Sequence, residues 1–366
     1  MIRFARTLST YIARQFFVWF CGVFGTMVSI TFLLDYIELL RRGGTRTQAT
    51  WGVLLEMAVL KLPHTAQEVM PFAILFGTML AFWRLTRSNE LVVARAAGVS
   101  VWGFLTPAIT VALAIGVVAI TVFNPIASSM EGSYEKLDTR ILRQSGDPSS
   151  LSNAGLWLRQ SDPGGGQIIL HGEKVASTTL QLRDPSLYFL NKKAEFTSRI
   201  EAKSATLEPG FWHISGGERF QPNQPPQPVS DLQLPTTLTA SKIEESLAPP
   251  DTMSFWELPG YISLLEQSGF SAQRHRLQFN ILLARPLLFC AMVLIAATFS
   301  LRMQRRGGTA ALIVSGVAAG FLLYFVSDIV FALGLSAKIP VLLAAWTPAG
   351  VSLLFGASML LHLEDG

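Results

Sequence analysis

Charged residues are scarce in this sequence of 366 residues: they make up 15% of it, half of the residues are hydrophobic, and the mean hydropathy is +0.40. A soluble domain of this length would carry more charge on its surface, so the composition excludes an ordinary water-soluble protein and indicates a membrane protein. The net charge is only +4, and the basic residues lie at the ends of apolar runs. This distribution excludes a nucleic-acid-binding face.

Cysteines and catalytic motifs are equally scarce. The two cysteines, Cys21 and Cys290, both lie inside apolar runs, which excludes a disulfide framework. The sequence has no phosphate-binding G-x-x-x-x-G-K-[ST] and no zinc-binding H-E-x-x-H, and its five histidines are scattered. We therefore predict a chain that is not an enzyme and has no metal site or cofactor of its own. A transporter of this kind is either a secondary carrier or uses the ATP of a separate ATPase.

Six apolar runs are long enough to cross a bilayer. They lie at about residues 12–40, 53–84, 101–123, 277–300, 308–335 and 339–361. The first run follows a basic N-terminus and has no small-residue cleavage site, so we expect a transmembrane helix there and not a signal peptide. Pro63 and Pro71 interrupt the second run and predict a kinked helix.

Residues 124–252 follow a different pattern. Short apolar runs alternate with polar residues and are separated by turn signals such as Asp184-Pro185 and Glu208-Pro209-Gly210. This spacing predicts an all-β domain, either a sandwich or a jellyroll-like fold.

The chain then returns to the membrane. Ser254 and Glu257 have the spacing of a capping box, which predicts an amphipathic connecting helix within residues 253–276. The predicted fold is an α-helical membrane protein with six transmembrane helices and one inserted periplasmic all-β domain. Three helices lie in residues 1–123, before this domain, and three in residues 277–366, after it.

Lysine and arginine residues in the short loops predict the orientation of the chain, because cytoplasmic loops carry the excess of positive charge. One side has nine: Arg3, Arg6, Arg14, Arg84, Arg87, Arg95, Arg302, Arg305 and Arg306. The other side has five: Arg41, Arg42, Arg46, Lys61 and Lys338. We therefore expect both termini to be cytoplasmic and the β domain to lie in the periplasm of a Gram-negative cell.

The stretch from Arg84 to Ser100 is a charged segment between two uncharged runs, which is typical of a short loop at one bilayer face. Ser88 or Asn89 can cap a short helix here and Gly98 can end it, so we predict a helix over residues 88–98. From its residues alone, this helix is either an ordinary interfacial loop or a docking helix on which a soluble motor protein pushes.

The arrangement of three spans, an outer β domain and three further spans, with the sequence from Asn89 to Gly98 (NELVVARAAG), resembles the LptF/LptG family of lipopolysaccharide export permeases, and its LptG members most. Gly155-Leu156-Trp157, the run from Phe255 to Leu258 (FWEL) and Asp328 support this resemblance, which covers essentially the whole chain. It implies the permease subunit of an ABC-type exporter that draws lipopolysaccharide from the outer leaflet of the inner membrane.

The resemblance also implies partners. They are an LptF-like second permease that pairs with this chain, an LptB-like ATPase dimer that consumes the ATP, and LptC- and LptA-like periplasmic proteins that receive the lipopolysaccharide. By the same resemblance, Glu90, Leu91 and Arg95 couple the permease to the ATPase.

Arg41 and Arg42 lie at the outer end of the first span, near Asp35 and Glu38. One interpretation is a pair of membrane-anchoring arginines with a Glu38–Arg42 ion pair. The other is a clamp for the phosphates of lipopolysaccharide, because a guanidinium group can bind phosphate through two parallel hydrogen bonds. The family pattern also has basic residues here, which favours the clamp. Asp35 departs from that pattern, since LptG members tend to carry a lysine at this place.

Asp328 is the only charge deep in the fifth span, and intramembrane carboxylates commonly face a polar cavity or a partner. We predict that it joins Asp35, Arg41 and Arg42 in binding the substrate, with a structural hydrogen bond to a neighbouring helix as the alternative. Two other function classes stay open: an ion-driven secondary lipid transporter and a membrane anchor for a periplasmic binding domain. Co-purification with a separate ATPase would favour the permease.

Overall fold

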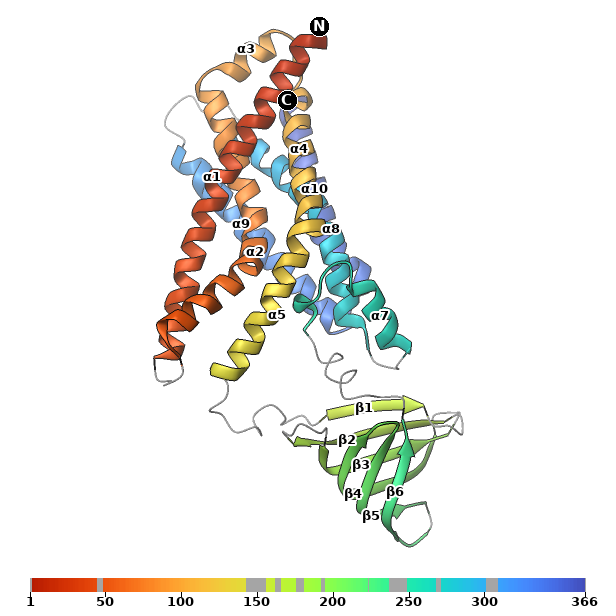
Figure 1. The fold of residues 1–366 in the computed structure, drawn as a ribbon. Helices are drawn as coiled ribbons and strands as arrows, with labels where there is room; N and C mark the ends of the chain where they lie inside the picture. Colours follow the sequence, from red (N-terminus) through yellow and green to blue (C-terminus); the bar gives the residue numbers. More distant parts are fainter. Residues whose placement is uncertain are drawn as a thin grey trace. The chain divides into compact units, whose positions relative to one another are not determined.

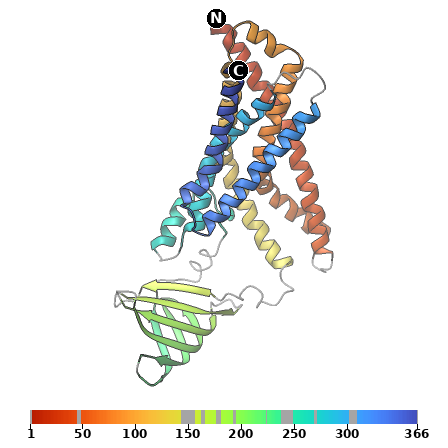
Figure 2. The same ribbon diagram turned by 180° about the vertical axis from the view of Figure 1, so that it is seen from behind.

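A computed structural model describes residues 2–44, 49–142, 156–161, 166–175, 181–191, 195–222, 224–236, 249–267, 271–300 and 309–365. Two compact units can be distinguished (Figures 1 and 2). The first consists of helices and comprises Met1–Asp138, Pro250–Pro259 and Gln273–Gly366. The second comprises Thr139–Pro249 and Gly260–Ala272 and contains the β-sheet. The long helices before and after the β region therefore belong to one unit.

Six helices among the described residues are long and apolar enough to cross a membrane, which confirms the six-span prediction. They are α1 (Ile2–Gly43), α2 (Trp51–Arg87), α4 (Val101–Val118) with its continuation, α8 (Gln273–Ser300), α9 (Thr309–Leu335) and α10 (Val341–Asp365). The shorter helical elements are α3 (Glu90–Ala96), the single turn η3 (Pro250–Thr252) and α7 (Leu258–Gln267).

The core of the helical unit lies between α1, α2, α4 and α8. Helix α8 has no charged residue after Arg285, and nearly all of its side chains from Phe289 to Ser300 are buried, as expected of the central helix of a bundle. Helix α9 and one face of α1 instead expose large apolar side chains such as Leu33 and Phe321. In a membrane protein, such surfaces face lipid or another protein.

Close packing and one bend shape the bundle. Both Pro63 and Pro71 lie inside α2, and Figure 1 shows α2 bent in its first half, as the sequence predicted. Helices α4 and α8 approach each other closely where Gly116 meets Pro286. A Cβ atom added at Gly116 would lie 2.6 Å from the Cα of Pro286, so only glycine permits this contact.

The third span continues further than predicted. After α4, a π-helical turn, η1 (Ala119–Phe123), leads without a break into α5 (Asn124–Ile141). Pro125 has no N–H to donate to the carbonyl oxygen of Thr121 four residues earlier. Trp256 Nε1 donates a hydrogen bond to this oxygen at 3.1 Å, and the N–H of Phe255 donates to Asn124 Oδ1 at 2.8 Å. The chain that returns to the membrane is therefore docked on this junction.

Helix α5 corrects the predicted start of the β region at residue 124. Its residues are too polar to read as part of a span, and the sequence pattern therefore grouped them with the strands. In the structure one side of α5 is buried, through Asn124, Ala127 and Ser128, at the spacing of an amphipathic helix. The first strand among the described residues begins at Leu156.

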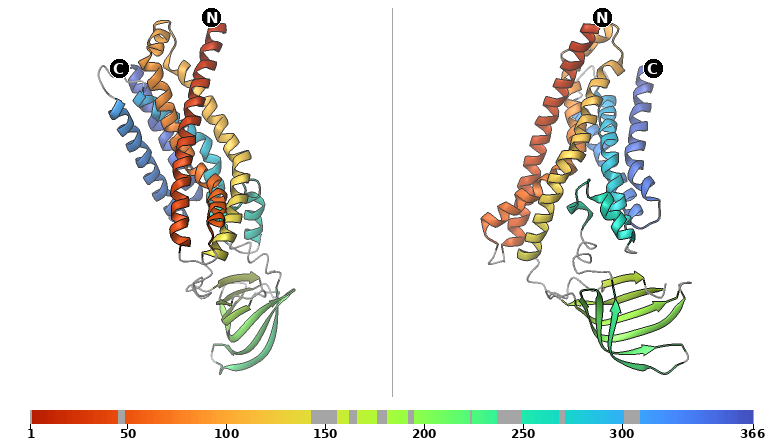
Figure 3. Two further views of the ribbon diagram at one scale, coloured as in Figure 1. Left: turned by 60° about the vertical axis from the view of Figure 1, so that its left-hand side comes forward. Right: turned by 45° about the vertical axis from the view of Figure 1, so that its right-hand side comes forward.

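The second unit contains one six-stranded antiparallel sheet with its strands in sequence order. The strands are β1 (Leu156–Ser161), β2 (Gln167–Val175), β3 (Gln181–Leu190), β4 (Phe196–Glu208), β5 (Phe211–Phe220) and β6 (Gln227–Pro235). The all-β prediction is confirmed. The described strands form a single curved sheet (Figure 3), without the crossover connections of a sandwich or jelly roll. The alternation of apolar and polar residues predicts where strands lie, but it does not indicate which strands pair with each other.

The two turn signals of the β region behave differently. Pro209 and Gly210 form a two-residue hairpin between β4 and β5, and Gly210 has the positive φ of +91° that this turn requires. Asp184-Pro185 is not a turn, because it lies inside β3, where Asp184 has a φ of +45°. One half of the predicted capping box before α7 is present: the N–H of Ser254 donates to Glu257 Oε2 at 3.0 Å. Ser254 Oγ donates to the same oxygen at 2.8 Å, and the N–H of Glu257 donates to the Ser254 carbonyl.

Candidate functional site

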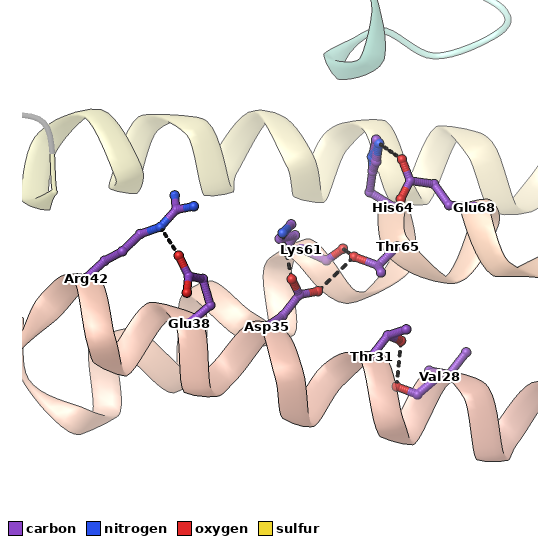
Figure 4. Close-up of polar contacts among 9 residues, drawn as sticks. All are labelled: Val28, Thr31, Asp35, Glu38, Arg42, Lys61, His64, Thr65 and Glu68. Carbon is purple, nitrogen blue, oxygen red and sulfur yellow. Dashed lines mark hydrogen bonds and ion pairs between the residues drawn. The ribbon is translucent and has the colours of Figure 1, made fainter. Parts of the chain in front are cut away.

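The last turns of α1 carry two arginines held by one carboxylate. Arg41 Nη2 lies 2.8 Å from Glu38 Oε2, and Arg42 Nε lies 2.7 Å from Glu38 Oε1. Figure 4 shows the Glu38–Arg42 pair. The arginine side chains are 77% and 58% exposed, so most of their N–H groups remain open to water or a ligand. Exposed pairs of this kind contribute about 0–1 kcal/mol to stability. The predicted Glu38–Arg42 ion pair is therefore present, and it leaves both guanidinium groups accessible.

Asp35 has its hydrogen-bond partners on the neighbouring helix. It bonds to α2 and not to the arginines: Lys61 Nζ donates to Asp35 Oδ1 at 2.7 Å, and Thr65 Oγ1 donates to Oδ2 at 3.1 Å (Figure 4). Asp35 and Glu38 are three residues apart on one helix face, but the neighbouring helix comes closer to Asp35. Sequence reasoning assigned Lys61 only to the charge count of a loop. Its place within an apolar run was the signal that could have marked it as a site residue.

Helix α5 brings acidic groups to the same place. Asp138 lies within electrostatic range of Arg42, and Glu131 within range of Lys61. Glu131 Oε2 is buried and has no hydrogen-bond partner among the described residues. The outer-end cluster, defined as Asp35, Glu38, Arg41, Arg42 and Lys61, therefore combines three cations with nearby carboxylates. Such a mixed cluster keeps its cations oriented and can exchange a carboxylate for another anion.

Asp328 lies in the wall of a cavity of about 410 Å³ between α2, α5, α8, α9 and α10. Arg285 and Gln67 also line this cavity, and the Arg285 guanidinium donates a hydrogen bond to Gln67 Oε1. No ion pair or hydrogen bond joins Asp328 to Asp35, Arg41 or Arg42, all of which the structure describes. Asp328 therefore lines a cavity together with other polar side chains, but the structure does not bring it together with the arginines.

At the opposite end of the bundle, α3 (Glu90–Ala96) occupies the loop between α2 and α4. Its C-terminus is closed as predicted: Gly98, with a φ of +84°, donates to Arg95 O at 2.9 Å, and Val99 N–H donates to Ala94 O at 3.1 Å. The predicted N-terminal cap is absent. Asn89 has a left-handed φ of 59° and no capping side-chain bond, and Ser88 Oγ instead donates to Glu90 Oε1 at 2.8 Å.

The two faces of α3 differ. Leu91 is 6% exposed and, with Ala94, belongs to the core cluster of the helical unit. Leu91 therefore anchors α3 and does not form part of its surface. Val92, Val93 and Arg95 point outward, and Val93 is 68% exposed. Exposed valines on a charged loop helix were missed from the sequence, since the burial of each position depends on how α3 lies on the bundle.

Comparisons with known proteins place this arrangement in context. Residues 10–362 match the family described as "Lipopolysaccharide export system permease LptF/LptG". The chain is 24% identical, over 97% of its length, to the lipopolysaccharide export system permease protein LptG of Escherichia coli strain K12, of which it covers 98%. It is 25% identical, over 95% of its length, to the protein of the same name from Haemophilus influenzae, of which it covers 96%. The similarity extends through both the helical and the β regions.

Proposed function

Because the chain belongs to the LptF/LptG family of lipopolysaccharide export permeases, we propose that it is one permease subunit of an ABC-type exporter in the inner membrane. In this proposal the chain extracts lipopolysaccharide from the outer leaflet of the inner membrane and hydrolyses no ATP itself. A separate LptB-like ATPase dimer drives the transport. The observation that carries this proposal is α3, an exposed helix anchored to the bundle by one face and free on the other.

The free face of α3 supports docking of the ATPase. An ordinary surface loop gains nothing from exposing Val92 and Val93, whereas an interface gains affinity by covering apolar side chains. Arg95 lies on the exposed surface as well and would contact acidic groups of the ATPase. Glu90 is the acidic residue of this coupling helix, and Leu91 serves by fixing α3 to the bundle.

The orientation follows from the basic residues. With α3 on the cytoplasmic side, both termini are cytoplasmic and the β domain is periplasmic, in agreement with the excess of nine basic residues over five. Arg46, Arg302, Arg305 and Arg306, which enter that count, lie outside the described residues.

The remaining partners follow from the surfaces of the chain. We assign the exposed apolar side chains of α1 and α9 to contacts with an LptF-like second permease and with lipid. The β domain, a single antiparallel sheet in its described part, would pass lipopolysaccharide to LptC- and LptA-like periplasmic proteins. The names of the relatives say only that they are permease proteins of a lipopolysaccharide export system, and the partners are part of this proposal.

The substrate contact in this proposal is the outer-end cluster. Arg41 and Arg42 are exposed, and phosphate offers more charge and more acceptor oxygens than the single carboxylate of Glu38, so phosphate can replace it. Lys61 supplies a third cation, and its ion pair with Asp35 fixes the position of its ammonium group. Asp35 thus acts on the substrate indirectly, through a lysine on α2. Asp328 would bind polar parts of the substrate, or of a lipid, that enter its cavity.

Two experiments test the proposal. Purification from native membranes is expected to retain an ATPase and a second six-span protein, and the absence of both would contradict it. A photo-crosslinking residue at Arg41 or Arg42 is expected to capture lipopolysaccharide, with less capture during ATP turnover. Leu354 on α10 is the control, since it is exposed and remote in sequence from the cluster. Equal capture at Leu354 and at the arginines would leave the arginines as membrane anchors only.

A further inference from the structure

Arg285 on α8 carries a positive charge into the helical unit without a carboxylate partner. Its guanidinium donates a hydrogen bond to Oε1 of Gln67 on α2, and Arg285 has no ion pair among the described residues. Gln67 is neutral and only 6% exposed, so it orients the guanidinium but does not balance its charge. A guanidinium has five N–H donors, and a charge within a membrane helix is costly without a partner. Arg285 is therefore available to bind an anion.

The cavity beside Arg285 also has negative groups in its wall. Three carboxylates line it: those of Glu68, Asp251 and Asp328. Asp251 Oδ1 accepts a hydrogen bond from Gln278 Nε2 at 2.9 Å, and Glu68 lies 3.8 Å from His64 (Figure 4). Among the described residues, none of the three forms an ion pair with Arg285. The cavity of about 410 Å³ thus holds a positive group and negative groups apart from each other, as a ligand with both charges requires.

A hydroxyl group in the same wall has no partner. Ser327, next to Asp328 on α9, lines the cavity, and its Oγ is buried without a hydrogen-bond partner among the described residues. A serine within a helix can donate to the carbonyl one turn earlier, as Ser300 does to Ala296. An unpaired buried hydroxyl destabilises a protein, so its place in a cavity wall indicates a polar ligand.

The cavity lies in the half of the helical unit away from α3. Its residues on α2 fall between His64 and Pro71, whereas α3 follows the far end of α2 at Arg87 (Figure 1). In the proposed orientation this half lies in the outer leaflet. Tyr324, which lines the cavity, and Phe325 beside it are 57% and 55% exposed, so α9 offers an apolar surface next to the polar groups. A ligand with a charged head and apolar chains fits both.

We propose that this cavity binds the headgroup of a zwitterionic phospholipid of the phosphatidylethanolamine type. Arg285 binds the phosphate through parallel N–H groups, and the hydroxyl of Ser327 donates to another phosphate oxygen. The ammonium group lies among the carboxylates, with Asp328 as one acceptor. A primary ammonium has three N–H donors for carboxylates, whereas a trimethylated amine has none. The inference deepens the proposed role of Asp328 and rests on the proposed function for its place in the outer leaflet.

A phospholipid bound here would join α9 to its neighbours. Ser327 and Asp328 lie on α9, Arg285 on α8 and Gln67 on α2, so one headgroup contacts three helices. The cavity shares no residue with the outer-end cluster. Binding of this phospholipid therefore leaves the groups that would hold lipopolysaccharide unoccupied.

The test titrates the purified, delipidated full chain in detergent with short-chain phosphatidylethanolamine or phosphatidylglycerol and measures binding by native mass spectrometry. The wild type is expected to bind phosphatidylethanolamine more tightly, because both lipids have the phosphate but only this one has the amine. Arg285→Gln should weaken both lipids by about tenfold to a hundredfold, the range of hydrogen bonds to a charged group. Asp328→Asn should weaken only phosphatidylethanolamine, by about twofold to fivefold, since Asp328 is exposed. Arg274→Gln is the matched control, because Arg274 is exposed on the same helix and does not line the cavity.

Two further measurements keep the test decisive. Ser327→Ala changes no charge and should weaken both lipids by about twofold to tenfold, so it replaces Arg285→Gln if that variant does not fold. Lipopolysaccharide is added as a competitor and should not displace phosphatidylethanolamine.

Three results would overturn the inference: equal affinity of Arg285→Gln and Arg274→Gln for phosphatidylethanolamine, equal affinity of the wild type for both phospholipids, or displacement by lipopolysaccharide, which would assign the cavity to the substrate. The titration needs no ATPase. Failure of ATP-driven export would thus refute the proposed function without changing this result, and failure to bind the phospholipid would refute only this inference.

Discussion

Removing the charge of Lys61 alone is predicted to destabilise the helical unit more than removing it together with that of Asp35. Lys61 Nζ lies 2.7 Å from Asp35 Oδ1, and Thr65 is the other hydrogen-bond donor to this carboxylate. In Lys61→Met the carboxylate keeps only the hydroxyl of Thr65. In Asp35→Asn with Lys61→Met neither charge is left. A partly buried charge without a partner destabilises the folded protein, so the double variant should lose less free energy of unfolding than Lys61→Met.

The size of the effect follows from burial. The side chain of Asp35 is 21% exposed and that of Lys61 36%. A fully exposed pair contributes about 0–1 kcal/mol, whereas breaking a buried pair by removing one partner costs about 3–5 kcal/mol. Partial exposure screens the charges, which places the cost of Lys61→Met at about 2 kcal/mol. The double variant should recover about half of this, since the coupling free energy of contacting residues is commonly about 0.5–3 kcal/mol.

Thermal unfolding of the purified protein in detergent, followed by tryptophan fluorescence, measures these differences. The matched control is Lys338→Met, because Lys338 is exposed and has no ion pair among the described residues. Its Tm should equal that of the wild type. A double variant that unfolds at a lower temperature than Lys61→Met would refute the reasoning. Transport adds a second readout: if Lys61 also contacts lipopolysaccharide, the double variant regains stability but not transport.

Three further predictions concern single positions. Gly116→Ala should lower Tm, because the added methyl group overpacks against the facing proline of α8 at a cost of about 1–3 kcal/mol. Gly22→Ala should leave Tm unchanged, because a Cβ at Gly22 meets nothing within 4 Å. Equal Tm values for the two variants would argue against close α4–α8 packing. Gly98→Ala should weaken the end of α3, since a left-handed φ costs about 1–2 kcal/mol for alanine; retained transport per ATP would show that this helix end does not matter for coupling. Single cysteines at Gln224 and Ser88 should react with an impermeant thiol reagent from opposite sides of the membrane, and reaction from one side would end the six-span arrangement.

The sequence by itself determined the features that depend on neighbouring residues. The six spans follow from the length of apolar runs, the end of α3 from the glycine at position 98, and the bond from the Ser254 N–H to Glu257 before α7 from the spacing of these two residues. Each of these signals is complete within a few turns of chain. The pairing of Glu38 with Arg42 belongs with them, because both residues lie on one helix, four positions apart.

Only the tertiary structure decided which distant groups meet. Asp35 bonds to Lys61, which is 26 residues away, and Gln67 on α2 bonds to Arg285 on α8, which is 218 residues away. The physical reason lies in the composition of membrane helices. A helix in water shows its buried face by an apolar stripe, whereas α2 is apolar on nearly every side, so its sequence does not indicate which side faces α1. The rotation of each helix about its axis is set by close packing with its neighbours, as at Gly116 and Pro286, and that packing selects the partner of every polar side chain.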